Sequence, residues 1–399
     1  MKIDRIETVR LAEFPNLVWL RVHTDEGLWG LGETSLAAGS VECYLHEFVA
    51  PRVIGKNPLQ IERLSRDLAG YLGFRGSGVE TRALSAFDIA LWDLYGKVCN
   101  QPLWQVLGGA SREAIRTYNT CAGYRYIRDT RQQDSSNWGL GAQAGGPYED
   151  LEGFLHRADE LAQSLLEQGI TAMKIWPFDR HAEASDGLHI SGPDLDSALE
   201  PFRKIRRAVG NRMDIMVEFH SLWRLPAAQR IARALAEFDT YWHEDPIRMD
   251  SLALLKQYAP SSRAPICASE ILAGRWSFKD LLETGVVGVV MFDLAWCGGI
   301  SEARRIAALA DAWQLPVAPH DCTGPVVYLA STHFSIHASN ALVQESVRAF
   351  YTGWYHELVT QVPQPVRGML PAPAGPGLGC ELLPGLTKRK DASVRISPA

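Results

Sequence analysis

The chain has 399 residues, 46% hydrophobic and 22% charged, a composition typical of globular proteins. This length exceeds what one ordinary core can organise, so we expect two domains or a barrel with a cap. The net charge is -6, and no basic cluster is longer than residues 388–390, which argues against nucleic acid and anionic membranes as partners.

Other features bear on localisation. No apolar stretch approaches the ~20 residues that a membrane-spanning helix needs. Residues 1–10 alternate charged and apolar side chains and lack the apolar centre of a signal peptide. The seven cysteines are scattered, odd in number and without a CxxC pair, as expected in a reducing compartment. The sequence therefore predicts a cytoplasmic protein.

The first 112 residues mix strand-like and helical patterns. Strands are predicted over residues 2–10, 17–23 and 28–34, with a turn at 24–27. Helices are predicted over residues 41–53, 60–69 and 79–99. The sequence thus predicts an α+β capping domain over residues 1–112. The segment 356–399, rich in proline and glycine near its start, is expected to return to that domain and complete it.

Eight short apolar segments follow and alternate with amphipathic helices. They cover residues 114–121, 171–176, 214–218, 240–244, 265–270, 289–293, 316–320 and 342–345. Strands that alternate with helices indicate βαβ units and a parallel sheet. Eight such units within residues 113–355 predict an α/β fold of the TIM type, a (β/α)8 barrel that carries the catalytic residues.

Polar residues stand at or near the ends of seven of these segments. They are Lys174, Glu218, Glu244, Glu270, Asp293, His320 and Glu345. From Glu218 onward the intervals are 26, 26, 23, 27 and 25 residues, each the length of one strand–helix unit. We therefore expect these side chains to gather at the C-terminal mouth of the barrel, where barrel enzymes carry out their chemistry.

Three of these carboxylates predict a magnesium site. Glu218, Glu244 and Glu270 offer the oxygen ligands that Mg²⁺ prefers. An ion bound there could hold a substrate carboxylate and offset the charge of an enediolate. Each carboxylate taken alone could instead be a helix cap or a solvated loop group, and the common register of all seven positions favours the site.

The remaining polar ends suit acid–base chemistry. His320 is the candidate base, with Asp293 on the preceding strand to orient it. Lys174 supplies a cation near the developing anion. Glu345 could hydrogen-bond a carboxylate oxygen if it is protonated or paired, because two bare carboxylates repel. Alone, Lys174 could be a salt-bridge partner, His320 a buried structural histidine and Asp293 a helix cap.

These motifs resemble, in order, those of the mandelate racemase subgroup of the enolase superfamily. The barrel motifs are Met173-Lys174-Ile175-Trp176, Val217-Glu218-Phe219-His220, His243-Glu244-Asp245-Pro246, Ala268-Ser269-Glu270, Asp293-Leu294, Gly298-Gly299-Ile300, Ala318-Pro319-His320 and Gln344-Glu345. Gly30-Leu31-Gly32-Glu33 and the helix around Asp88 and Asp93 are similar to that superfamily's capping domain. The resemblance spans nearly the whole chain and implies a cap, a barrel and Mg²⁺.

Within that subgroup the pattern is similar to the galactonate dehydratase type. That type has one lysine on the second strand, and here Trp176 takes the place of a second lysine. It also has a carboxylate, one residue and then a histidine on the third strand, as in Glu218-Phe219-His220. The resemblance implies that His220 protonates a leaving hydroxyl and that His320 is the base. Glu218 departs from the family, which usually has aspartate there.

Three functions remain open from the sequence. The leading hypothesis is a Mg²⁺-dependent acid-sugar dehydratase that removes the α-proton, passes through an enediolate and loses water to give a 2-keto-3-deoxy acid. The second is a racemase, epimerase or cycloisomerase of a hydroxy acid, and the third is a non-catalytic barrel that binds a sugar acid. We expect a small hydroxy acid or sugar acid as ligand and a homo-oligomer. Residues 124–147 form a long segment that could be a lid or disordered.

Overall fold

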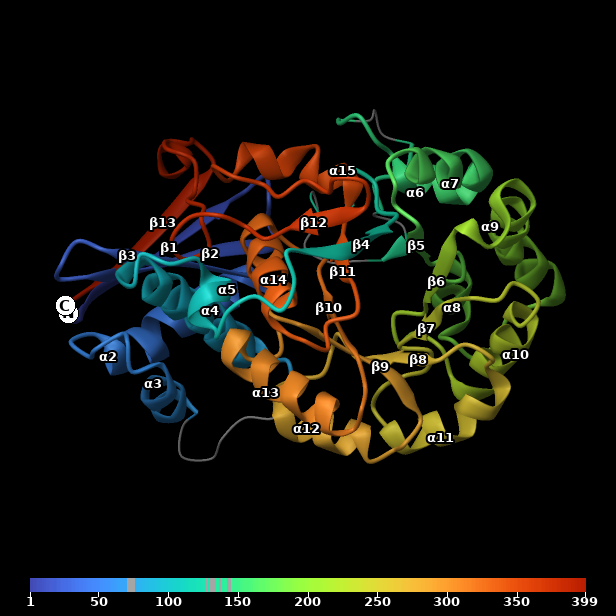
Figure 1. Ribbon diagram of the computed structural model, residues 1–399, viewed down its shortest axis with the longest axis horizontal. Helices are drawn as coiled ribbons and strands as arrows, with labels where there is room; N and C mark the ends of the chain where they lie inside the picture. Colours follow the sequence, from blue (N-terminus) through green and yellow to red (C-terminus); the bar gives the residue numbers. More distant parts are fainter. Residues whose placement is uncertain (70–75, 127, 129–133, 136–137, 142–144) are drawn as a thin grey trace.

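The computed structural model describes residues 1–69, 76–126, 128, 134–135, 138–141 and 145–399. Two sheets organise them, a four-stranded antiparallel sheet at one end of the molecule and a larger parallel sheet beside it (Figure 1). The smaller sheet has the order β13-β1-β2-β3. Its strands are β1 (Ile3–Leu11), β2 (Leu17–Thr24), β3 (Trp29–Ser35) and β13 (Ala392–Pro398). The pairing of β13 with β1 confirms that the C-terminal tail completes the cap.

Helices of the cap pack against this sheet. They are α1 (Ala38–Tyr44), the π-helical η1 (Leu45–Val49), α2 (Ala50–Val53), α3 (Ile61–Leu68), α4 (Val79–Val98) and α5 (Leu103–Val106). Two glycines let β3 approach α4: a Cβ on Gly30 or Gly32 would lie 1.9 Å from the carbonyl oxygen of Ala90 or Ala86. The Gly-x-Gly motif therefore serves close packing of strand on helix.

The parallel sheet is a nearly closed barrel of eight strands, as predicted. The order is β10-β9-β8-β7-β6-β5-β4-β11, and a bridge between Val317 and Ala341 links its two ends. The strands are β4 (Ala114–Thr120), β5 (Ala172–Ile175), β6 (Asp214–Glu218), β7 (Trp242–Glu244), β8 (Ile266–Ala268), β9 (Val287–Asp293), β10 (Val317–His320) and β11 (Gln344–Ser346). The short β12 (Met369–Pro371) pairs with the start of β4. The predicted domain boundaries at residues 112 and 355 stay a prediction.

Helices surround the barrel (Figure 1). They are α6 (Asp150–His156), α7 (Ala158–Glu167), α8 (Asp179–Ser185), α9 (Gly192–Val209), α10 (Leu225–Leu235), α11 (Leu255–Tyr258), α12 (Gly274–Leu282), α13 (Gly299–Ala312), α14 (Pro325–His337) and α15 (Arg348–Tyr351). Local signals define α9, where the Ser191 side chain accepts a hydrogen bond from Asp194 N and Gly210 ends the helix with φ 58°. None of the described helices is long and apolar enough to cross a membrane.

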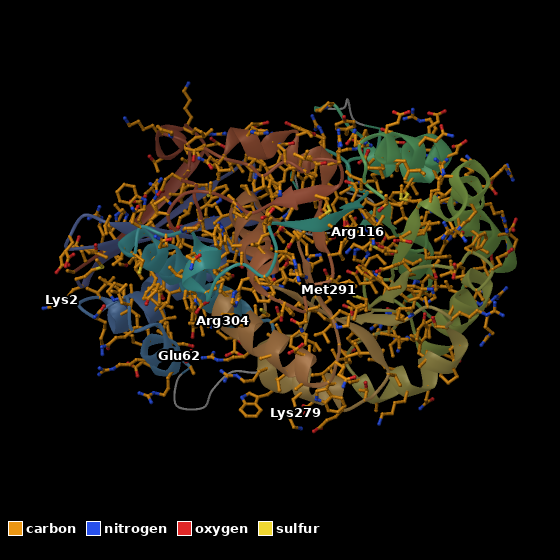
Figure 2. All side chains as sticks on the ribbon, in the orientation of Figure 1. Lys2, Glu62, Arg116, Lys279, Met291 and Arg304 are labelled. Atoms are coloured by element: carbon orange, nitrogen blue, oxygen red, sulfur yellow. The ribbon has the colours of Figure 1, made fainter. Side chains whose placement is uncertain are left out.

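The interior of the barrel is a packed apolar core. Side chains from successive strands fill it: Tyr118, Ala172, Met216, Trp242, Cys267, Val289, Met291, Ala318 and Val343. Met291 lies near the centre of the molecule (Figure 2). This layer fills the described part of the barrel below the strand ends, so a ligand site within the barrel is expected at its C-terminal mouth.

Candidate active site

The predicted site residues meet at the barrel mouth because six of them stand two positions after an inward-facing apolar residue. Residues i and i+2 of a strand point to the same face, so the polar side chains form the next layer above the core. The pairs are Ala172 and Lys174, Met216 and Glu218, Trp242 and Glu244, Met291 and Asp293, Ala318 and His320, and Val343 and Glu345.

Glu270 reaches the mouth differently. The sequence places it at the end of the fifth strand, whereas β8 ends at Ala268 and Glu270 lies two residues beyond it. Its carboxylate nevertheless approaches the same group, with Oε2 2.7 Å from Nε2 of His320. The prediction of a common location therefore holds for Glu270, although a loop and not a strand positions it.

Lys174 is the buried cation among the carboxylates. Its Nζ lies 2.7 Å from Glu244 Oε1, 2.9 Å from Glu345 Oε1 and 3.4 Å from Glu218 Oε2. Burial alone would lower the pKa of Lys174, but the charges of Glu244 and Glu345 raise it well above its usual value. Lys174 is therefore held in the charged form.

Glu218 and Glu244 lie side by side at the ends of paired strands. Burial raises the pKa of Glu218 to about 7 and also raises that of Glu244, which the neighbouring Glu218 raises further. Glu218 Oε1 accepts hydrogen bonds from the backbone N–H groups of Phe219 (2.9 Å) and His220 (2.6 Å). The extra methylene of glutamate thus lets one oxygen turn back to the chain and leaves Oε2 toward Lys174.

His320 is held by carboxylates on both ring nitrogens. Nδ1 lies 2.8 Å from Asp293 Oδ2, and Nε2 lies 2.7 Å from Glu270 Oε2. Burial alone would lower the pKa of His320, but Glu270 and Glu345 raise it well above its usual value. Burial likewise opposes ionisation of Glu270, yet His320 and the other nearby cations lower the pKa of Glu270 to about 2. The structure thus brings together the predicted base and its predicted orienting partner.

Glu345 is paired, which is one of the two conditions under which it could approach a substrate carboxylate. It accepts hydrogen bonds from the Thr120 hydroxyl and, at 2.7 Å, from the backbone N–H of Asp321. Burial would raise the pKa of Glu345, but Lys174 and His320 lower it below its usual value. Glu345 is therefore an ionised carboxylate with its oxygens already engaged.

His220 follows β6 and faces the same cavity. Its Nδ1 lies 2.7 Å from Asp179 Oδ2, and its ring meets the edge of Trp176 at a centroid distance of 5.8 Å. Burial would lower the pKa of His220, but the Asp179 carboxylate raises it above its usual value. Asp179 opens α8 and was not singled out from the sequence, because an acidic residue in a first helical turn is common on any surface helix.

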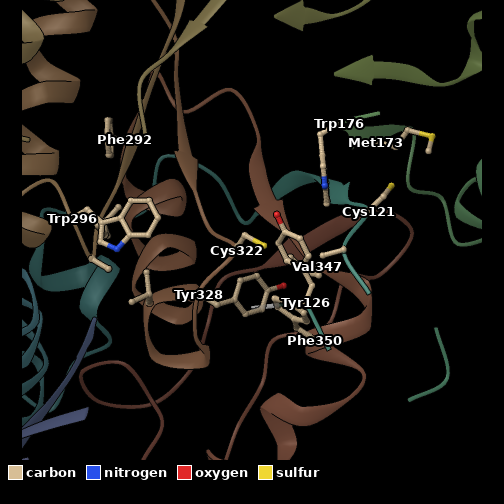
Figure 3. Close-up of a cluster of buried hydrophobic side chains, with 14 of the residues drawn as sticks. Cys121, Tyr126, Met173, Trp176, Phe292, Trp296, Cys322, Tyr328, Val347 and Phe350 are labelled. Carbon is tan, nitrogen blue, oxygen red and sulfur yellow. The ribbon is translucent and has the colours of Figure 1, made fainter. Parts of the chain in front are cut away.

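The cavity at the mouth has a volume of about 40 Å³. The barrel supplies Thr120, Tyr126, Lys174, Trp176, His220, Glu270, Trp296, His320, Cys322 and Thr323, and the cap supplies Asn16, Ser35 and Leu36. Figure 3 shows Trp296 and Trp176 on either side of Cys322 and Tyr126. The three cap residues lack any sequence signal of their own, because only the docking of the cap brings them here.

The long segment after β4 is described only in part. Residues 127, 129–133, 136–137 and 142–144, and with them Arg131, lie outside the described residues. Of the rest, Tyr126 is buried and packs on Trp176 at 5.4 Å, and Trp138 meets Trp176 edge-on at 6.5 Å. The described part of this segment therefore borders the cavity, which keeps the lid a hypothesis.

The donors at the mouth fit a hard cation. Eight buried carboxyl groups lie there: Asp179, Glu218, Glu244, Asp245, Glu270, Asp293, Asp321 and Glu345. The described basic groups that interact with them are Lys174, His220, His320 and Arg82. Neighbouring buried carboxyls cannot all ionise without more positive charge, and no donor among the described residues hydrogen-bonds Glu218 Oε2.

As they stand, the described side chains do not form a closed ligand set. No three His, Cys, Asp or Glu residues in the described part of the chain are grouped closely enough to hold an ion. The reason is visible in the contacts, since Lys174 holds Glu244 and His320 holds Glu270. Binding of an ion to the predicted trio would need Glu270 to turn from His320, and the trio stays a prediction.

Comparisons with known proteins agree over the whole chain. Residues 157–385 match the enolase C-terminal domain-like family, and residues 6–108 match the N-terminal domain of mandelate racemase and muconate lactonizing enzyme. The D-galactonate dehydratase of Xanthomonas euvesicatoria pv. vesicatoria is 30% identical, covering 98% of this chain and 94% of its own. The D-xylonate dehydratase of Haloferax volcanii is also 30% identical, and the match covers 92% of this chain and 84% of that protein.

A solved structure is similar at higher identity. It is an enolase of the mandelate racemase subgroup from Agrobacterium tumefaciens, with a succinimide residue. It is 58% identical to this chain, with a TM-score of 0.88, and the match covers 100% of this chain and 99% of that one. The arrangement of cap and barrel described above is therefore shared with a crystal structure.

Replacing the buried lysine should destabilise the fold. Lys174→Met leaves Glu244 and Glu345 without their counter-ion, and loss of one partner from a buried pair typically costs ~3–5 kcal/mol. Denaturant unfolding in buffer without divalent ions measures the free energy of unfolding. The control is Lys279→Met, which breaks an exposed pair with Glu283 at the periphery of the molecule (Figure 2) and should cost ~0–1 kcal/mol. Equal losses in both variants would contradict the expectation.

Proposed function

The chain belongs to the mandelate racemase subgroup of the enolase superfamily, and we propose that this hydro-lyase dehydrates a sugar acid to a 2-keto-3-deoxy acid. One observation carries the proposal: two histidines, His320 and His220, line one cavity, each with a buried carboxylate on Nδ1. β-Elimination of water needs a base for the α-proton and an acid for the leaving hydroxyl. D-Galactonate and D-xylonate, named in two relatives, are both aldonates, so aldonates are the first substrates to test.

In this proposal His320 removes the α-proton. Asp293 on Nδ1 leaves Nε2 as the nitrogen that takes the proton, and the Asp293 carboxylate stabilises the imidazolium that results. Glu270 stands 2.7 Å from Nε2, so it must give way when the substrate enters. The ring of Trp296 lies beside His320, with centroids 5.4 Å apart, and limits the direction from which C2 can approach.

Members of the superfamily generally use a divalent metal, and the proposed ion here is Mg²⁺. Glu218, Glu244 and Glu270 would hold it. Bound there, it would bind the substrate carboxylate and offset the negative charge of the enediolate. Lys174 adds a fixed positive charge on the same side, next to Glu244 and Glu345.

His220 is the proposed acid. Hydroxide is a poor leaving group, so departure of the β-hydroxyl requires a proton, and a histidine can hold one near neutral pH. An epimerase needs an acid–base partner across from His320, and Trp176 cannot exchange a proton. Lys174 could serve, but its Nζ is engaged by Glu244 and Glu345. This favours dehydration over the racemase, epimerase or cycloisomerase alternative.

His320→Asn should remove the base. In a screen of aldonates, the wild type should form 2-keto acid from at least one, and the variant should be ~10²–10⁴-fold slower, the usual contribution of a positioned base. Proton NMR in deuterated water measures exchange at C2, which the variant should also lose. Retained exchange would assign the base to another residue, Lys174 first.

His220→Asn should separate the two halves of the reaction. The variant should lose 2-keto acid formation by ~10²-fold or more while exchange at C2 continues, because His320 remains. Product analysis and deuterium content of the recovered substrate measure both. If the variant dehydrates at the wild-type rate, His220 is not the acid. If the wild type only inverts C2, the isomerase alternative replaces dehydration.

Glu244→Gln should weaken Mg²⁺ binding, because an amide oxygen replaces an ionised ligand in the proposed set. Isothermal titration of metal-free protein with Mg²⁺ should give an affinity at least ~10-fold below that of the wild type. The matched control is Glu237→Gln, an exposed glutamate outside the cavity, which should bind as the wild type does. Unchanged affinity in Glu244→Gln would remove Glu244 from the ligand set.

A further inference from the structure

The ring of His220 is held by two residues from the stretch that leads from β5 into α8. Asp179, the first residue of α8, places Oδ2 2.7 Å from His220 Nδ1. Trp176 lies against the ring at an interplanar angle of 77°, and Tyr126 and Phe154 in turn pack on Trp176. The hydrogen bond to Asp179 and the packing against Trp176 therefore both restrict rotation of the imidazole ring.

The backbone at His220 is also fixed. His220 and the next residue, Ser221, both have positive φ, 49° and 55°, a region that residues other than glycine rarely adopt. Hydrogen bonds maintain this turn: His220 N donates to Glu218 Oε1 at 2.6 Å, and Ser221 N donates to the Asp245 carbonyl at 3.0 Å. Backbone conformations of this kind cluster at functional sites.

Among the described residues, His220 is the one ionic partner of the Asp179 carboxylate. Its side chain is 6% exposed, no lysine or arginine in the described part of the chain forms an ion pair with it, and Oδ1 accepts no hydrogen bond from the described residues. Nor does it cap α8, whose N-cap residue is Phe178 and has no side-chain hydrogen bond. Burying a carboxylate is costly unless it is paired, so its contact with His220 is the feature to explain.

The Asp179–His220 pair has the same geometry as the Asp293–His320 pair. Asp293 engages His320 through Nδ1 at 2.8 Å, and Asp179 engages His220 through Nδ1 at 2.7 Å. A carboxylate on Nδ1 fixes the tautomer and leaves Nε2 for the substrate. Both rings line the same cavity.

We propose that Asp179 is a positioning residue that holds His220 with Nε2–H toward the β-hydroxyl of the substrate. This role rests on the proposed dehydration. His320 takes the proton from C2, and the electron pair of that C–H bond moves into the carboxylate group to give the enediolate, from which it returns to form the C2–C3 double bond. The C3–O bond breaks with its electron pair, and His220 Nε2 gives its proton to that oxygen, which leaves as water. The enol then becomes the 2-keto acid by moving its hydroxyl proton to solvent and taking one at C3.

The test is the ratio of exchange to dehydration in deuterated water. Asp179→Asn keeps the size of the side chain but removes its charge, so kcat for 2-keto acid formation should fall ~10²-fold, with KM within ~3-fold. Exchange at C2 should continue because His320 is unchanged, so the ratio of exchange to 2-keto acid formation should rise and recovered substrate should contain more deuterium than it does with the wild type. Asp179→Glu should recover part of the lost kcat, because it restores the carboxylate.

Controls separate positioning from folding. Asp194→Asn alters another Asp–His contact, to His181 at 3.6 Å, outside the cavity, and should leave kcat and the exchange ratio unchanged. Thermal unfolding of Asp179→Asn should remain one cooperative transition well above the assay temperature, so that the variant is folded when kcat is measured. A proportional fall of exchange and dehydration, or wild-type dehydration by Asp179→Asn, would overturn the positioning role. Failure of the wild type to make 2-keto acid from any sugar acid would overturn the proposed function, and is seen without any variant.

Discussion

The excess of buried negative charge at the barrel mouth is the constraint on which the site depends. Parallel strands bring their C-terminal ends together, so a polar residue on each strand places many carboxyls in one small volume. Lys174 offsets part of this negative charge, because it forms ion pairs with Glu244, Glu345 and Glu218. Two histidines offset more of the negative charge: His320 pairs with Asp293, and His220 pairs with Asp179. A further cation would reduce the repulsion among the remaining carboxyl groups, which supports the proposed Mg²⁺ site.

The cap is part of the site and not an accessory to it. Trp296, beside His320, donates from its indole N–H to the Ser35 hydroxyl at 3.2 Å, and Arg82 of α4 lies over its ring at 4.5 Å. Glu33 of β3 accepts hydrogen bonds from the N–H groups of Val326 and Val327, in the first turn of α14. The cavity wall next to His320 is therefore built from both the barrel and the cap, and a barrel without its cap would leave the cavity open to water.

The sequence predicted the parts of the site that follow from periodicity. Regular intervals between strand ends were enough to bring Lys174, Asp293 and His320 to one mouth, because strand direction and the two-residue alternation decide where they point. The contacts of Glu270 and Asp179 could not be predicted. Glu270 lies on a loop past β8, and Asp179, at the start of α8, is 41 residues from His220, which follows β6. Such pairings depend on loop geometry and helix placement, which leave no period in the sequence.

The side chain at position 176 affects the charge near His220 and therefore bears on the proposed reaction. The indole is buried against Tyr126, Phe154 and His220, so this corner of the mouth is apolar and adds no charge. A lysine there would add a cation next to His220 and oppose its protonation, since like charges disfavour each other. Trp176 avoids that repulsion, and Asp179 supplies a negative charge at Nδ1 of His220. An apolar residue at position 176 therefore supports the proposed role of His220 as the acid of an elimination.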